Sequence, residues 1–223
     1  MPLQERAKAT KASIVEGAAA VFEEIGYGNA SLSNVAERAG VTKGALYFHF
    51  KSKEDLALAV IEAQHAVVSL EGQRIADQGH SALSTIMMMC GSFGRLLVRE
   101  PIVRAGIRLT LEASAFGQTV TRPYQDWIRT MELLTRQGQA DGEINEALDA
   151  AAFARYLVAS FTGVQMVSGI LTHRADVLQR IEEMWSILLP AMLPEARRGE
   201  FLELAHQIVH EEYPAGDPSV HSA

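Results

Sequence analysis

Apolar side chains recur at helical spacing along almost the whole chain of 223 residues. In the first segment this apolar stripe comprises Ile14, Val15, Ala18, Val21, Phe22 and Ile25. Spacing of three and four residues is typical of a helix that buries one face. We find no convincing run of alternating apolar and polar residues, and no internal repeat. The sequence therefore predicts an all-α chain.

Glycine, proline and capping residues divide this pattern into successive helices. The first is expected to end at Gly26, and the fourth to open at the capping sequence Ser52-Lys53-Glu54-Asp55 and run to about Asp77. Pro190 should kink or end the helix that contains it. Later helices are expected at roughly 82–98, after Pro101, and at 123–138, 149–171, 176–190 and 195–212.

Two short helices near the N-terminus are joined by a tight turn that contains glycine. Ser31 is the expected N-cap of the first, Gly40 ends it, and Thr42 is the expected N-cap of the second. This arrangement is a helix-turn-helix pattern. We expect a head at residues 1–52, a larger helical body at 53–213 and a disordered tail at 214–223.

Charge is distributed unevenly between these segments. The chain has a net charge of −7, but residues 1–53 contain seven Lys or Arg against five Glu. The remainder contains 13 basic and 22 acidic residues. This asymmetry favours a nucleic-acid-facing head on an acidic body, although ordinary surface variation would explain it too.

Composition excludes several other classes of protein. The single Cys excludes a disulfide scaffold and a Cys-cluster zinc site, and it fits a reducing compartment. The N-terminus has no apolar signal core, and the apolar runs are interrupted well short of about 18 residues. We therefore expect a cytoplasmic protein that neither is secreted nor spans a membrane.

The string from Val41 to Lys51 reads V-T-K-G-A-L-Y-F-H-F-K and would form the third helix. The side chains expected to pack inward are Ala45, Leu46 and Phe50. Those expected to point outward or lie at the ends are Thr42, Lys43, Tyr47 and His49. Gly44 costs a helix about 1 kcal/mol relative to alanine, and close approach to DNA would explain its presence.

The outward side chains of this helix suit DNA. Thr42 and the helix N-terminus can hold a phosphate, and Lys43 can reach a base acceptor or a phosphate. Tyr47, His49 and Lys51 are placed to anchor phosphates. The alternative is a solvated helix face with an incidental aromatic, but the whole string in a helix-turn-helix favours DNA.

Residues 7–53 resemble the DNA-binding head of the TetR family of transcriptional regulators. The matching strings are G-Y at 26–27, S-L-S-N-V-A-E-R-A-G-V at 31–41, T-K-G-A-L-Y-F-H-F at 42–50 and K-E-D-L at 53–56. Three features are similar to the γ-butyrolactone receptor subgroup known from antibiotic-producing actinomycetes. They are the form T-K-G-A-L-Y-F-H-F at 42–50, the string V-R-A-G-I-R-L at 103–109, and Trp127.

The resemblance implies an all-helical homodimer, with a three-helix DNA-binding head and a ligand-binding and dimerisation body in each subunit. Helices at 149–171 and 176–193 would form the dimer interface. The candidate contacts are Ala152, Ala159, Gly163, Ile181, Trp185 and Leu188, although packing within one subunit explains them almost as well. The two third helices would enter successive major grooves, about 34 Å apart, on a pseudo-palindromic double-stranded operator.

Further DNA contacts are expected beside the third helix. Ser33 could contribute to base readout, and a basic N-terminal arm with Arg6, Lys8 and Lys11 could contact the backbone or the minor groove. A ligand in the body would then move the fourth helix and change the spacing between the heads.

The body combines apolar volume with isolated polar groups, as a site for a small and mostly apolar effector does. The candidate ligand-binding residues are Gln64, Trp127, Thr130, Ser160, Thr162 and Gln165, with Met89 and Phe93 in a flexible wall. Several of them also have a structural interpretation. Trp127 could be a core residue, Ser160 and Thr162 could bond the carbonyl four residues back, Gln64 could be solvated, and the Met residues could fill the core. The resemblance implies a lactone or furan-type signal, with Trp127 over its ring and Gln64 and Ser160 as hydrogen-bonding groups.

No catalytic constellation and no cofactor motif is recognisable. Cys90 lies in an apolar helix and is expected to be a packed thiol. His206 and His210 are four residues apart, a spacing that can hold a metal, but the metalloprotease Glu is absent and we predict no metal site. A ligand-responsive repressor is therefore the favoured function. The alternatives are a regulator that answers a different ligand or none, as a pseudo-receptor or drug sensor, and an enzyme or partner-binding protein with a borrowed head.

Overall fold

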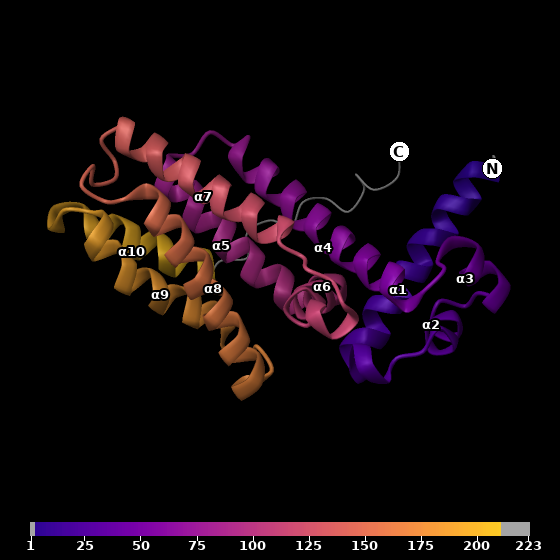
Figure 1. Cartoon of the computed structure of the whole chain (residues 1–223). Coiled ribbons are helices and arrows are strands. Elements are labelled where there is room, and N and C mark those ends of the chain that lie inside the picture. The colour runs from indigo at the N-terminus through magenta and orange to yellow at the C-terminus, as the bar shows by residue number, and fades with distance from the viewer. Residues whose placement is uncertain (1–2, 211–223) are drawn as a thin grey trace. The chain divides into compact units, whose positions relative to one another are not determined.

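The computed structural model describes residues 3–210, in which ten α-helices and one 3-10 helix occur and no strand (Figure 1). The all-α prediction is confirmed. The helices are α1 (Leu3–Asn29), α2 (Leu32–Arg38), α3 (Lys43–His49), α4 (Lys53–Ala76), α5 (Ala82–Arg99), α6 (Pro101–Leu111), η1 (Ala113–Phe116), α7 (Arg122–Ala140), α8 (Ala150–Thr172), α9 (Val177–Met192) and α10 (Glu195–His210). The expected tail at 214–223 lies outside the described residues.

Side-chain caps begin the three helices for which the sequence predicted them. The Ser31 hydroxyl accepts a hydrogen bond from the Asn34 amide at 3.1 Å, and Thr42 Oγ1 accepts one from the Ala45 amide at the same distance. Ser52 Oγ accepts from the Asp55 amide at 3.0 Å. The Asp55 carboxylate, however, accepts from the amide of Lys51 rather than that of Ser52, so the expected capping box at α4 is only half formed.

Two expected helix ends differ in the structure. Gly26 has φ +77°, so helical geometry breaks there as predicted, but further helical turns follow to Asn29. α9 continues through Pro190 to Met192, so the proline does not end the helix, one of the two expected outcomes. The final carbonyl groups find other donors: Pro190 O accepts from Arg198 Nη2 at 3.2 Å, and Met192 O from the Asn145 amide at 2.9 Å.

The described residues pack into two compact units. The first comprises residues 3–73 and 96–123, and the second comprises 74–95 and 124–210. The helix-turn-helix of the head therefore shares its core with the first part of α4 and with α6. The boundary at residue 52 was proposed to divide the DNA-binding head from the ligand-binding body, and it stays a prediction.

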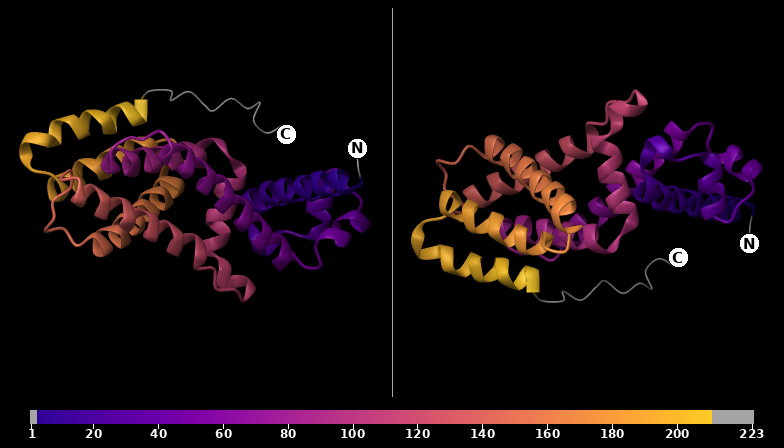
Figure 2. Two further views of the ribbon diagram at one scale, coloured as in Figure 1. Left: turned by 90° about the horizontal axis from the view of Figure 1, so that it is seen from above. Right: turned by 90° about the horizontal axis from the view of Figure 1, so that it is seen from below.

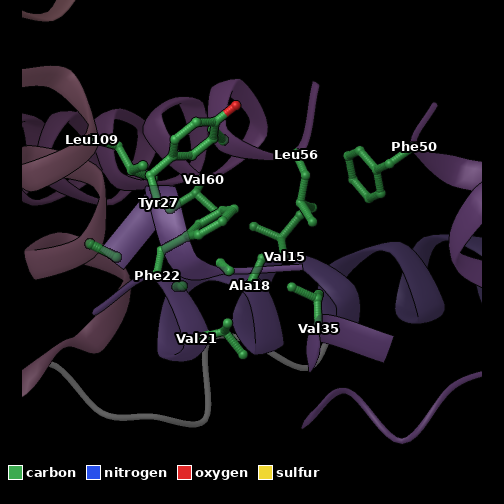
Figure 3. Close-up of a cluster of buried hydrophobic side chains, with 14 of the residues drawn as sticks. Val15, Ala18, Val21, Phe22, Tyr27, Val35, Phe50, Leu56, Val60 and Leu109 are labelled. Carbon is green, nitrogen blue, oxygen red and sulfur yellow. The ribbon is translucent and has the colours of Figure 1, made fainter. Parts of the chain in front are cut away.

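The core of the first unit explains why the three head helices hold their positions (Figure 3). Apolar side chains from α1, α2, α4 and α6 meet around Phe22, which is 1% exposed. Leu46 of α3 and Phe50, which follows it, are also buried, as the sequence predicted. Burying these few residues fixes the orientation of a helix of only seven residues.

In the second unit, α9 packs against both α8 and α10 (Figure 2). Its buried face contains Ile181, Trp185 and Leu188. These three were candidates for the dimer interface. Each is at most 7% exposed within the single chain, so the alternative of packing within one subunit is correct for them.

Candidate functional sites

α3 presents its polar side chains to solvent while Leu46 anchors it from below. Thr42, Lys43, Gly44 and Tyr47 are exposed, and His49 is half-buried. Ala45, expected to pack inward, is half-buried. The side chain that sequence reasoning missed is Phe48, which is 75% exposed and meets the His49 ring edge-on at 5.1 Å. Its position between the inward Leu46 and Phe50 was the available signal.

Gly44 has no structural reason within the chain to be glycine. A Cβ atom added there would meet only Thr42 Oγ1, at 3.9 Å, which is ordinary contact. Its backbone is helical, so no left-handed conformation requires glycine either. Alanine at this exposed position would make the helix more stable than glycine does.

Basic side chains lie on both sides of α3. Lys51 Nζ donates to Tyr47 O at 3.0 Å, which places this amine over the C-terminal end of α3. Lys11 Nζ lies 5.8 Å from the centre of the Phe50 ring, so the start of α1 lies beside the same end. Arg6 and Lys8 are exposed in α1, and Ser33 is exposed in α2. The expected basic N-terminal arm is helical from Leu3 onward.

Lys53 ties the turn between α1 and α2 to the start of α4. Its Nζ donates to Tyr27 O at 2.8 Å and Ala30 O at 3.0 Å, and it lies 4.4 Å from the Tyr27 ring centre. Burial, reinforced by the nearby Glu54 carboxylate, raises the pKa of Tyr27 to about 12, so its hydroxyl stays neutral. The K-E-D-L and G-Y strings thus share one contact.

Two arginines of the V-R-A-G-I-R-L string bind the end of α1. Arg104 forms an ion pair with Glu23, and Arg108 Nη1 donates to Glu23 O at 3.3 Å. Arg108 also pairs with Glu112 at 2.9 Å. A Cβ at Gly26 would come within 2.9 Å of Arg108 Nη2. Glycine at this position therefore serves two purposes: it adopts the positive φ and it leaves room for the guanidinium. Sequence analysis assigned these arginines no contacts.

Three aromatic rings form a cluster in the second unit, which we call the aromatic cluster: Phe93, Trp127 and Phe161. Their ring centres lie 4.4 Å (Phe93–Trp127), 5.2 Å (Phe93–Phe161) and 5.1 Å (Trp127–Phe161) apart. Phe93 and Phe161 are buried, while Trp127 is half-buried. The structure thus brings two of the candidate ligand residues together and adds Phe161, whose apolar helical setting gave no distinguishing signal.

The polar candidates divide into two groups. Thr130 Oγ1 donates to Asp126 O at 3.0 Å, and Thr162 Oγ1 donates to Val158 O at 2.8 Å. Both hydroxyls therefore bond to the carbonyl four residues back, which sequence analysis gave as the alternative for Thr162. Ser160 is half-buried on α8, and Met89 is half-buried on α5.

Gln64 and Gln165 are 2% and 3% exposed, and the Oε1 atom of each has no hydrogen-bond partner. The alternative that Gln64 is solvated is therefore wrong. An unsatisfied buried carbonyl costs about 1–3 kcal/mol, so each oxygen is a ready acceptor for a donor that is not part of the chain. Gln64 belongs to the first unit, where its side chain covers Gly106, and Gln165 belongs to the second.

Cys90 is a packed thiol, as predicted. It is fully buried, and burial raises the pKa of its thiol to about 12. At neutral pH it is a neutral apolar side chain rather than a nucleophile.

α8 carries an exposed stripe of small and apolar residues along one side, the α8 stripe: Ala152, Tyr156, Ala159, Gly163, Val167 and Ile170. Their spacing of three and four residues places them on one face. Tyr156, Val167 and Ile170 are 59%, 54% and 74% exposed. α8 is long and apolar enough to cross a membrane by length and composition alone, but one of its faces is buried, as in a core helix.

Comparisons with known proteins agree with this architecture. The family model for bacterial regulatory proteins of the tetR family matches residues 14–60, and the model for the tetracyclin repressor-like C-terminal domain matches residues 80–194. The body as well as the head therefore matches the family.

Individual relatives point to one subgroup. The A-factor receptor protein of Streptomyces griseus is 39% identical over 192 residues, which are 86% of this chain and 67% of the relative. A crystal structure of an ArpA-like γ-butyrolactone receptor is 33% identical, with a TM-score of 0.78 over 92% of this chain and 98% of the other. CprB from Streptomyces coelicolor, in complex with its operator, is 32% identical, with a TM-score of 0.80 over 92% and 99%. The chain thus belongs to the TetR family of transcriptional regulators, and within it to the relatives of the γ-butyrolactone receptors.

Proposed function

We propose that this protein is a transcriptional repressor that a small lactone or furan-type signal releases from a pseudo-palindromic operator. The observation that carries the DNA-binding part is Gly44, a helix-weakening residue kept at an exposed position where nothing in the chain requires it. Close approach of the α3 backbone to DNA is the physical reason for such a choice. A regulator of this kind acts in the cytoplasm, where the operator is.

In the proposed complex, α3 enters the major groove. Lys43 reads base acceptors, and the exposed Phe48 adds apolar contact of the kind that thymine methyl groups receive. Phosphate contacts come from Thr42, Tyr47, His49 and Lys51. Supporting contacts come from Ser33, Arg6, Lys8 and Lys11, whose side chains are exposed.

The effector site is proposed at the aromatic cluster in the second unit. Trp127 is the only half-buried member of the cluster, so its ring can face a ligand while Phe93 and Phe161 hold it. Gln165 offers a buried oxygen to a hydroxyl donor of the ligand. Ser160 and Met89, both half-buried, are included as further contacts. Gln64 belongs to the first unit and is a separate candidate, on account of its own buried and unsatisfied oxygen. The hydroxyls of Thr130 and Thr162 are already bonded and contribute less.

The α8 stripe is the proposed dimer surface. TetR regulators work as dimers, and small residues at Ala159 and Gly163 let a second helix approach closely. Apolar side chains at this level of exposure remain unfavourable in water until another apolar surface covers them. A second copy of the chain supplies an identical stripe across a two-fold axis.

The test is a gel-shift titration with the purified dimer on DNA from upstream of its own gene, at stated salt. We expect specific binding that a synthetic γ-butyrolactone reverses. Trp127→Ala should keep the binding and lose the reversal. Leu133→Ala is the control that keeps both, because Leu133 lies on the same helix, is 60% exposed and is outside the proposed site. No specific binding by a folded dimer would contradict the DNA-binding role.

The second candidate is a regulator of the same fold that answers a different ligand or none. It predicts specific DNA binding that γ-butyrolactones leave unchanged. A panel of lactones, butenolides and apolar drugs added to the bound complex separates the two functions, because only the primary proposal requires release by the first class.

A further inference from the structure

α9 and α10 bring three metal-ligating side chains together on the surface of the second unit. His206 and His210 lie one turn apart on α10, and their ring centres are 4.2 Å apart. Glu182 of α9 faces both of them. Sequence analysis considered the histidine pair alone and predicted no metal there, since the metalloprotease Glu is absent. Glu182 is 24 residues from His206 in the sequence, and only folding brings the two together.

The distances fit a tetrahedral ion. Glu182 Oε1 lies 3.1 Å from His206 Nδ1, and its Oε2 lies 3.5 Å from His210 Nε2. One ligand atom from each residue lies within 4.8 Å of the other two. Ligands bound at about 2.0 Å in a tetrahedron are about 3.3 Å apart, so small side-chain rotations would complete the geometry.

We propose that Glu182, His206 and His210 form a binding site for a divalent transition-metal ion, Zn²⁺ above all, that joins α10 to α9. Two imidazole nitrogens and one carboxylate oxygen suit Zn²⁺, Ni²⁺ or Cu²⁺ rather than Mg²⁺ or Ca²⁺, which prefer oxygen alone. Solvent would complete the coordination, because all three side chains are at least 29% exposed.

Simple hydrogen bonds between histidine and glutamate are the competing explanation. In that case each imidazole would donate a ring N–H to one oxygen of the same carboxylate, and no ion would be needed. The two explanations differ in what added metal does, because only a metal site binds Zn²⁺ with saturation through all three side chains.

α10 provides a firm base for such a site. Arg95 Nη1 of α5 donates to Ile208 O at 2.6 Å, between the two histidines in sequence. Gly91 gives room for the Ile208 side chain, because a Cβ there would come within 2.0 Å of it. The turn that carries both histidines is therefore held on the body before any metal binds, which reduces the ordering that binding requires.

The experiment titrates ZnCl₂ into the full-length chain, freed of any affinity tag and of metal, by isothermal calorimetry. We expect about one Zn²⁺ per chain, a rise in Tm on binding and no response to MgCl₂. His206→Gln, His210→Gln and Glu182→Gln should each weaken binding at least about tenfold and abolish the rise in Tm. Co²⁺ should give the visible absorption of a tetrahedral site in the wild type and lose it in these variants.

His80→Gln is the matched control, since His80 is exposed, its ring nitrogen pairs with Gln78 at 3.1 Å, and it is not one of the three clustered side chains. Binding should survive this change. No saturable Zn²⁺ binding by the wild type would overturn the proposal, as would variants of the three ligands that bind with wild-type affinity. Operator binding by the metal-free chain is measured in parallel and tests the regulatory function separately.

Discussion

At the scale of single residues, Gly44 separates stability from function. Gly44→Ala should raise the free energy of unfolding by about 1 kcal/mol, because helix propensity improves and the added methyl group meets nothing closer than 3.9 Å. It should also weaken operator binding at least about tenfold, equivalent to about 1.4 kcal/mol, by holding the α3 backbone off the DNA. Urea unfolding and fluorescence anisotropy on labelled operator measure the two effects.

Gly199→Ala is the control for this experiment. Gly199 lies within α10, and a Cβ there meets nothing within 4 Å. The control should gain similar stability without a change in operator affinity. Unchanged operator affinity in Gly44→Ala would show that glycine is not needed for approach to DNA.

Gln165 gives the corresponding test of the effector site. Gln165→Met keeps the side-chain length and removes a buried carbonyl oxygen that lacks a partner. The free energy of unfolding without ligand should stay equal or rise, by up to about 1–3 kcal/mol, while release from the operator by a γ-butyrolactone is lost. Thermal unfolding and the gel shift provide the measurements. A clear loss of stability would mean that the amide makes interactions the fold depends on.

At the scale of the elements, the junction of α8 and α9 depends on Asp176. Its Oδ1 accepts hydrogen bonds from Ser168 Oγ and Thr172 Oγ1, both at 2.6 Å, and Oδ2 pairs with Arg180 at 3.1 Å. The two hydroxyl bonds lower the pKa of Asp176 to about 2 from its usual 3.8. A lowered pKa in the folded state means that the ionised carboxylate stabilises the fold.

This stabilisation should be complete above pH 3.8 and should disappear as the pH falls through about 2. Asp176→Asn is therefore expected to unfold at lower urea concentration than the wild type at neutral pH. The gap between the two midpoints should narrow as the pH is lowered toward 2. A gap independent of pH would show that the charge of Asp176 contributes nothing, and that only hydrogen-bond geometry matters.

The helices that the sequence predicted well are those with local signals. Ser31 and Thr42 begin α2 and α3 because capping uses atoms within three residues, and Gly26 breaks α1 because φ is positive there. Pro190 does not end α9, and Arg198 and Asn145, which bond the last carbonyls of α9, come from other segments. A pattern within one helix holds no information on such partners.

The sites follow the same division. Exposure along α3 followed from the period of its own apolar residues, so Tyr47 and Lys43 were found correctly as outward groups. Phe161 and Glu182 were missed because what distinguishes them, an aromatic neighbour and a histidine pair, lies on other helices. The sequence could not decide whether the hydroxyls of Thr130 and Thr162 bond to a ligand or to the backbone. The distances to the carbonyls four residues back show that they bond to the backbone.

At the scale of the whole molecule, the α8 stripe predicts an oligomer that one charge can dissociate. Ile170→Glu should shift the protein from dimer to monomer in sedimentation equilibrium, because a carboxylate would be buried without a partner at a two-fold contact. Operator affinity should fall with it, since one head contacts only half of a palindrome. The helical content should be unchanged, because Ile170 is 74% exposed in the single chain.

Leu133→Glu is the control for surface charge. Leu133 lies on α7 and is 60% exposed. The control should remain a dimer with unchanged operator affinity. Dissociation by both substitutions, or by neither, would place the subunit contact away from the α8 stripe.

The exposed face of α8 also sets how the regulator responds to its own abundance. While most chains are still single, the number of pairs rises with the square of the chain concentration, so halving synthesis lowers the number of competent repressors about fourfold. The genes under its control would then sense how fast the chain is made and diluted by growth as well as whether a signal is present. The exposed face of α8 would thus make the amount of active repressor depend steeply on the concentration of the chain in the cell.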